Sequence, residues 1–160
     1  LTIVLSILLA AALHECGHIA AMHLVGARVT DLQFCAFGVR MKKQGLLSYG
    51  QEAAVYFGGA AANLAALAAV FPFAGWNLFT TANAALAVFN LLPIGRLDGG
   101  VLLHLLLCRA GGLERADLLR RVIGFVILTP LFAGGFWLLM RGNCTLLFTA
   151  VYLAVTLLCA

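Results

Sequence analysis

Long apolar stretches alternate with short polar ones along the chain. Five of the apolar stretches are each about 20 residues or longer, which is the length a helix needs to cross a bilayer. They cover residues 1–25, 51–73, 76–107, 119–140 and 143–160. The pattern predicts an all-α, multi-pass membrane protein with about five transmembrane segments.

The third apolar stretch is longer than one membrane crossing requires, and it contains the sequence NLLPIGRLDGG at residues 90–100. Pro93 and the three glycines of this sequence should interrupt a helix. Non-helical backbone at membrane depth persists only where protein or a water-filled cavity covers it. We therefore predict that the third segment is broken at its middle and that the break carries a functional site.

The polar segment between the first two apolar stretches has a different periodicity. Apolar residues alternate with polar ones over part of residues 29–41, which predicts a short β-hairpin at the membrane interface. Ser48, followed by Gln51, forms a capping-box pattern that predicts the start of the second helix. Because no repeat or linker divides the sequence, we expect a single domain covering residues 1–160.

The composition favours a membrane protein without a soluble domain over the alternative, a soluble helical bundle. Hydrophobic residues make up 64% of the chain, charged residues only 10%, and the mean hydropathy is +1.06. In a soluble domain about a quarter of the residues are charged. A chain of 160 residues with this composition has too few polar groups to cover its own surface. The chain begins at Leu1 rather than at methionine, as we expect of a fragment or a trimmed chain.

The basic residues predict the orientation in the membrane. Eight of the ten lie in two loops, one after the first apolar stretch and one between the third and fourth: Arg28, Arg40, Lys42, Lys43, Arg109, Arg115, Arg120 and Arg121. With five spans these loops fall on the same side, which the positive-inside rule assigns to the cytoplasm. The net charge of +4 therefore reflects topology, and we expect no nucleic-acid partner.

The sequence HECGH places three ionisable side chains inside the first apolar stretch. His14 and His18 are four residues apart, so they lie on one helical face and can reach the same metal ion. Glu15 lies beside them, where its carboxylate can deprotonate a metal-bound water, as in H-E-x-x-H enzymes. Ionisable residues within a membrane helix indicate function. The alternative is that the two histidines are polar contacts between helices and that Glu15 is neutral.

Asp98 is the candidate for a third ligand. A hydrolytic zinc site has three protein ligands and an open fourth position. Asp98 is the acidic residue at the predicted break, and Gly99 and Gly100 beside it allow close approach of the backbone. Helix geometry places His18 and Asp98 in the same, cytoplasmic, half of the membrane. The sequence therefore predicts one zinc ion per chain.

The segments HECGH, GGAAANL and NLLPIGRLDGG, in this order, resemble the motifs of the site-2 protease family of intramembrane zinc metalloproteases. The small size is most similar to the sporulation-type (stage IV) branch. The resemblance covers residues 1–108, which would hold the metal site, and leaves residues 119–160 as accessory membrane helices. It implies that His14, His18 and Asp98 bind zinc and that Glu15 is the catalytic acid and base.

Two asparagines also match the family's motifs. Asn63 corresponds to the asparagine of G-P-x-x-N, and Asn90 to that of N-x-x-P. Either could donate a hydrogen bond to the developing oxyanion, or each could only tie helices together. The chain departs from the family pattern at Ala60 and residues 95–96, where prolines are usual, and at Val101, where a basic residue is common.

These features together predict an intramembrane zinc endopeptidase that takes part in regulated intramembrane proteolysis. We expect a bacterial integral membrane protein with its active site towards the cytoplasmic side. Its partners would be the lipid bilayer, a membrane-embedded or membrane-associated protein substrate, and a regulatory membrane protein. The alternatives are a multi-pass metal transporter and an inactive protease relative that binds partners. Replacing Glu15 with Gln distinguishes them, because only a protease should lose its activity and keep its metal.

Overall fold

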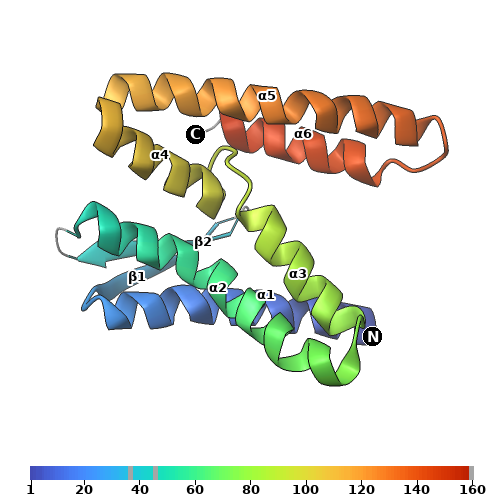
Figure 1. Ribbon diagram of the computed structural model, residues 1–160, viewed down its shortest axis with the longest axis horizontal. Helices are drawn as coiled ribbons and strands as arrows, with labels where there is room; N and C mark the ends of the chain where they lie inside the picture. The colour runs from blue at the N-terminus through green and yellow to red at the C-terminus, as the bar shows by residue number, and fades with distance from the viewer. Residues whose placement is uncertain (36–37, 45–46, 159–160) are drawn as a thin grey trace. The chain divides into compact units, whose positions relative to one another are not determined.

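The computed structural model describes residues 1–35, 38–44 and 47–158, and for the two strands it describes the backbone only. Six helices and two strands follow one another in these residues (Figure 1): α1 (Thr2–Leu24), β1 (Arg28–Cys35), β2 (Gly38–Gln44), α2 (Tyr49–Ala74), α3 (Leu78–Asn90), α4 (Asp98–Gly111), α5 (Leu113–Leu139) and α6 (Thr145–Leu158). The chain divides into two compact units, Leu1–Phe89 and Asn90–Ala160. The expectation of a single domain stays a prediction.

The predicted fold class, with about five transmembrane segments and a short interface hairpin, requires correction. Within the described part of the chain, only α1, α2 and α5 are long and apolar enough to cross a membrane. Helix α3 has 13 residues, and α4 and α6 have 14 residues each. At about 1.5 Å per residue they reach about 20 Å, which is less than the roughly 30 Å of the hydrocarbon core. Apolar composition alone therefore overestimates the number of spans.

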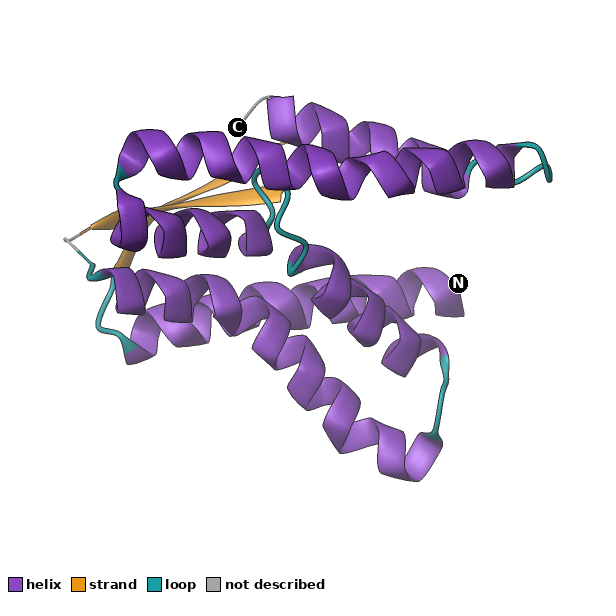
Figure 2. Ribbon diagram, turned by 45° about the horizontal axis from the view of Figure 1, so that its top comes forward, coloured by secondary structure: helices purple, strands orange, loops and turns teal. Residues whose placement is uncertain are grey.

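Strands β1 and β2 form a two-stranded antiparallel sheet (Figure 2). Its register pairs Arg28 with Gln44. The strands therefore extend over more of the chain than the short hairpin predicted at residues 29–41. Residues 36 and 37, which fall within the predicted hairpin, lie outside the described residues.

Helices α1 and α2 lie side by side within the first unit, as both ribbon views show (Figures 1 and 2). The buried residues of α1 recur every four positions: Ala10, His14, His18 and Met22. The backbones of the two helices come close at Gly17 of α1 and Gly58 of α2. A Cβ atom on Gly58 would lie only 2.7 Å from the carbonyl oxygen of Gly17. Small residues let membrane helices approach in this way, and the approach brings the histidine face of α1 against α2.

The predicted capping box at the start of α2 is confirmed. The backbone N–H of Gln51 donates to the hydroxyl of Ser48 at 3.3 Å, and the backbone N–H of Ser48 donates to the side chain of Gln51 at 3.0 Å. The amide of Gln51 also donates to the carbonyl of Val25, just past the end of α1, at 3.5 Å. The cap therefore satisfies helix-end N–H groups and ties the start of α2 to the end of α1.

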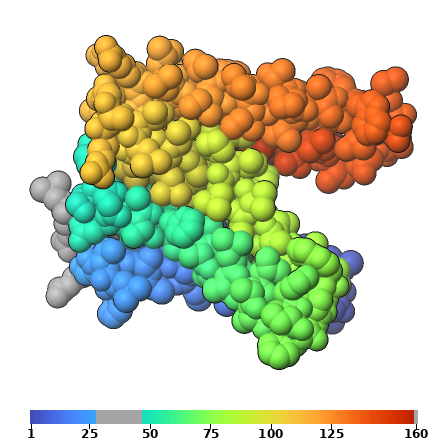
Figure 3. Space-filling model, viewed as in Figure 1, coloured from blue at the N-terminus to red at the C-terminus, as the bar shows by residue number. Residues whose placement is uncertain are grey.

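In the second unit, glycines allow α5 to pack against α6. A Cβ atom on Gly124 would lie 2.7 Å from a methyl carbon of Leu157, and one on Gly135 would lie 2.9 Å from the Cα of Leu147. The space-filling view shows the two helices in contact (Figure 3). Helix α4 packs against the same helix, α5.

The third apolar stretch breaks between α3, which ends at Asn90, and α4, which begins at Asp98. The turn between them folds back onto the start of α4. A Cβ atom on Gly100 would lie 2.5 Å from the carbonyl oxygen of Gly95, and one on Gly99 would lie 2.7 Å from that of Leu92. The two glycines therefore permit the close backbone approach that the sequence predicted, and Asp98 opens a helix whose first turn contacts the preceding turn.

Candidate metal centre

The two histidines of α1 project from its buried face towards α2. His14 is 6% exposed and His18 is 9% exposed. Their Nε2 atoms lie 3.2 Å apart, and the two rings stand nearly perpendicular, with an interplanar angle of 88°. The spacing of four residues therefore does bring the two imidazoles together at one point, as the sequence predicted.

The other nitrogen of each ring is held by a hydrogen bond to an oxygen. His18 Nδ1 lies 2.8 Å from the carbonyl oxygen of Val55, and His14 Nδ1 lies 2.7 Å from the side-chain oxygen of Asn63. A carbonyl oxygen can only accept, so Nδ1 of His18 carries the proton. Metal-binding histidines commonly donate their second N–H to such an oxygen, because the bond orients the ring.

The orientation of the Asn63 amide follows from its other contacts. Its Nδ2 group donates to the carbonyl of Ala10 at 2.9 Å and to the side-chain oxygen of Asn83 at 2.8 Å. Both amide hydrogens are thus directed at oxygens, which assigns Oδ1 to the position facing His14. Nδ1 of His14 must then be the donor as well.

These bonds decide the chemistry of the two facing nitrogens. With a proton on Nδ1, a neutral imidazole presents a lone pair at Nε2. Two such acceptors at 3.2 Å repel one another unless a proton or a metal cation neutralises them. The arrangement of His14 and His18 therefore fits a metal ion that takes both Nε2 atoms as ligands.

Gly59 keeps open the space beside these nitrogens. A Cβ atom at this position would lie 2.5 Å from Nε2 of His18 and 2.8 Å from Nε2 of His14. Any side chain larger than hydrogen would therefore displace the imidazoles or occupy their coordination side. This glycine belongs to the GGAAANL segment, so the same helical face of α2 supplies both the open space and Asn63.

The support for His14 extends to a third helix of the first unit. Asn83 of α3 accepts from Asn63 and donates through its Nδ2 group to the carbonyl of Phe79 at 2.9 Å. Asn63 and Asn83 are both fully buried. The sequence predicts Asn83 as a polar contact between helices, and its bond to Asn63 confirms this. Its link to His14 could not be predicted, because Asn63 lies 20 residues away on another helix.

The remaining predicted site residues occupy distinct positions. Glu15 is half-buried and adjoins His14 on α1. Asp98 is half-buried and is the first residue of α4, in the second unit, where a helix N-terminus favours a carboxylate. Asn90 ends α3. The first unit by itself thus brings together His14, His18 and Asn63, whereas Asp98 and Asn90 belong to the second unit.

The chain matches no protein-family model and no curated protein by sequence. Its structure is similar to a solved structure described as "Site-2 Protease from Methanocaldococcus jannaschii", with a TM-score of 0.70 and 18% sequence identity. The match covers 95% of this chain and 74% of that one. The chain has the fold of a site-2 protease. The likeness concerns the fold alone, because so few residues are identical.

Proposed function

We propose that the protein is an intramembrane zinc endopeptidase, which hydrolyses a peptide bond in or near the membrane segment of a membrane-associated protein. The observation that carries this proposal is the pair of imidazoles whose Nδ1–H bonds direct both Nε2 lone pairs to one point beside Gly59. Further support comes from the fold of a site-2 protease and from three apolar helices of spanning length, which support a membrane protein.

The proposed ligands are Nε2 of His14, Nε2 of His18 and the carboxylate of Asp98, which form a candidate ligand set among the described residues. Two imidazoles and one carboxylate are a donor set that suits zinc in hydrolytic enzymes. A zinc ion bound there would polarise the scissile carbonyl and make water nucleophilic near neutral pH. The protein itself contributes the hydrogen bonds that orient the imidazole rings of His14 and His18 in the absence of metal.

Glu15 is the proposed acid and base. It follows His14 directly on α1, so its side chain leaves the helix about 100° away from the first ligand. From there the carboxylate would accept a proton from the attacking water and return a proton to the leaving amine. Its half-buried position is compatible with contact to both the site and the substrate.

The two asparagines take different proposed roles. Both amide hydrogens of Asn63 are engaged by Ala10 and Asn83, which favours the helix-linking alternative over donation to an oxyanion. We assign it the role of holding His14. Asn90 remains the proposed oxyanion donor, because it ends α3 immediately before the turn that leads to Asp98.

The proposal also covers the orientation in the membrane, the substrate and the regulator. The basic residues that follow α1 favour an active site towards the cytoplasm, and we propose a multi-pass bacterial membrane protein. We propose a membrane-embedded or membrane-associated protein as substrate and a second membrane protein as regulator, as in the sporulation-type branch that the motifs resemble. Selection of the substrate would then depend on the membrane region or on that partner.

The decisive experiment compares the zinc content of the detergent-purified wild-type chain with that of Glu15→Gln and Asp98→Ala. We expect one tightly held zinc in the wild type, retention of zinc without peptide cleavage in Glu15→Gln, and loss or weakening of zinc in Asp98→Ala. A well-folded wild-type chain without zinc, or zinc that is indifferent to Asp98, would exclude the proposed site. Metal flux that survives Glu15→Gln would identify a transporter instead.

A further inference from the structure

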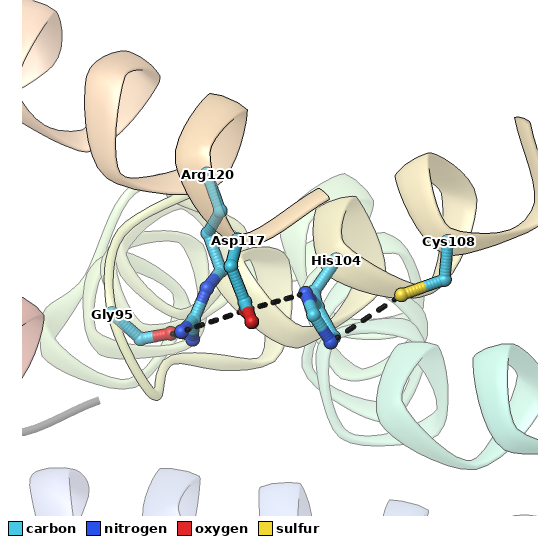
Figure 4. A network of polar contacts seen from close by, with 5 residues as sticks. All are labelled: Gly95, His104, Cys108, Asp117 and Arg120. Carbon is cyan, nitrogen blue, oxygen red and sulfur yellow. Dashed lines mark hydrogen bonds and ion pairs between the residues drawn. The ribbon is translucent and has the colours of Figure 1, made fainter. Parts of the chain in front are cut away.

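A network of polar side chains in the second unit reaches the turn that precedes Asp98 (Figure 4). Arg120 of α5 donates from one guanidinium nitrogen to the carbonyl oxygen of Gly95 at 3.5 Å. Its other terminal nitrogen lies 3.6 Å from a carboxylate oxygen of Asp117, one helical turn earlier. The guanidinium thus spans the distance between α5 and the turn, with Asp117 as its counter-charge.

The turn itself has a demanding backbone. Gly95 has a φ of +55°, a conformation that residues with a Cβ rarely adopt, and a Cβ there would lie 2.7 Å from the backbone of Thr156 in α6. Ile94 beside it is fully buried. The carbonyl that Arg120 holds therefore belongs to the tightest point of the turn, three residues before Asp98 and in contact with the first turn of α4.

Keeping an arginine in this place is costly. The side chain of Arg120 is only 12% exposed, and its Nε atom is buried without a hydrogen-bond partner among the described residues. A buried charge with an unsatisfied donor destabilises a protein unless its other contacts compensate. The side chain is nevertheless held in this buried position by its contacts with the Gly95 carbonyl and the Asp117 carboxylate, which indicates that these contacts serve a purpose.

Asp117 extends the network to α4. Its carboxylate lies 3.5 Å from Nδ1 of His104, whose Nε2 lies 3.4 Å from the thiol of Cys108 on the same helix (Figure 4). The carboxylate therefore faces a group on α4 as well as the guanidinium on α5. The network connects α5 with both the turn and the body of α4.

We propose that Arg120 is a positioning residue for Asp98, and this inference rests on the zinc site of the proposed function. By holding the carbonyl of Gly95, Arg120 determines where the turn ends and where α4 begins. Asp98 is the first residue of that helix, so a displaced turn would move its carboxylate. Asp117 keeps the guanidinium aimed at the turn.

The test compares Arg120→Met and Arg120→Lys with the matched control Arg121→Met. Arg121 is the next residue of α5 and is exposed. For each full-length chain in detergent, we would measure the rate of zinc loss to a chelator, the absorption spectrum of the cobalt-substituted form, and the thermal midpoint. A readout of metal geometry is needed because a merely structural role would move the midpoint alone.

We expect Arg120→Met to lose zinc about 10- to 100-fold faster than the wild type, the range typical of lost support around a metal ligand. Its cobalt spectrum should change, Arg120→Lys should restore part of both properties, and Arg121→Met should match the wild type. If Arg120→Met does not fold, Asp117→Asn and Arg120→Lys serve the same comparison, because each keeps the size of the side chain.

Wild-type zinc retention and an unaltered cobalt spectrum in folded Arg120 and Asp117 variants would overturn the inference. This failure differs from failure of the proposed function. In the latter case the wild-type chain itself holds no zinc, or its zinc does not depend on Asp98.

Discussion

At the scale of single residues, the site depends on which nitrogen of each imidazole carries its proton. His14 and His18 could be paired from their spacing alone, because residues four apart share a helical face. Their Nδ1 partners could not, since Asn63 lies 49 residues and Val55 lies 37 residues away along the chain. Those distant oxygens hold the rings of both histidines in a fixed orientation, with their Nε2 atoms facing one another.

Replacing Asn63 with Leu should weaken zinc binding about 10- to 100-fold, because His14 loses the acceptor that fixes its tautomer and ring orientation. Asn83→Leu should have a smaller effect, since Asn63 keeps its bond to Ala10. Zinc affinities measured by chelator competition would show this order. Equal affinities for the wild type and Asn63→Leu would contradict the assigned role.

Gly59→Ala should abolish tight zinc binding, because the added Cβ would lie 2.5 Å from Nε2 of His18. The rings cannot yield without breaking their Nδ1 hydrogen bonds. Gly50→Ala is the matched control on the same helix, where an added Cβ has no neighbour within 4 Å. Zinc content by elemental analysis should fall only in the Gly59 variant, and a full complement of zinc there would refute the steric argument.

At the scale of elements, close contact between α1 and α2 brings the histidine face and the Asn63 face together. The capping box at Ser48 could be predicted because it is a local pattern, and it is present. The number of spanning helices was overestimated because apolar composition does not report where a helix ends. Pro93 and the glycines of the turn divide the third apolar stretch into α3 and α4, as the sequence indicated. Each of these helices is too short to span the membrane.

Gly17→Leu should separate α1 from α2 and destabilise the fold by about 1–3 kcal/mol, the usual cost of overpacking. The neighbouring residue Cys16 is exposed, so Cys16→Leu should leave stability unchanged. Thermal unfolding in detergent would compare the two variants. If Gly17→Leu kept the wild-type thermal midpoint, the contact between α1 and α2 would tolerate a larger side chain at this position.

At the scale of the whole molecule, the proposed zinc site takes its residues from both units of the chain. The first unit carries His14, His18 and Glu15, and the second carries Asp98, its turn and Arg120. The similarity to the fold of a site-2 protease covers 95% of the chain and therefore extends over both units. The lipid bilayer is the expected surroundings of the long apolar helices.

The predicted orientation can be tested across α5, which is long enough to span. In a cysteine-free background, Arg115→Cys should react with a membrane-impermeant maleimide only from the cytoplasmic side. Gly142→Cys, just past the other end of α5, should react only from the opposite side. Labelling of both positions from one side would show that α5 does not cross the membrane.

By itself, the sequence determined the apolar helices, the capping box, the break before Asp98 and the pairing of the two histidines. These are local properties, since each depends on residues within one or two helical turns or on the composition of one segment. Only the tertiary structure decided which nitrogens face one another, that Gly59 leaves room beside them, that Asn83 bonds to Asn63, and that Arg120 bonds to the carbonyl of Gly95. Such contacts join positions far apart in the chain, and no local pattern specifies them.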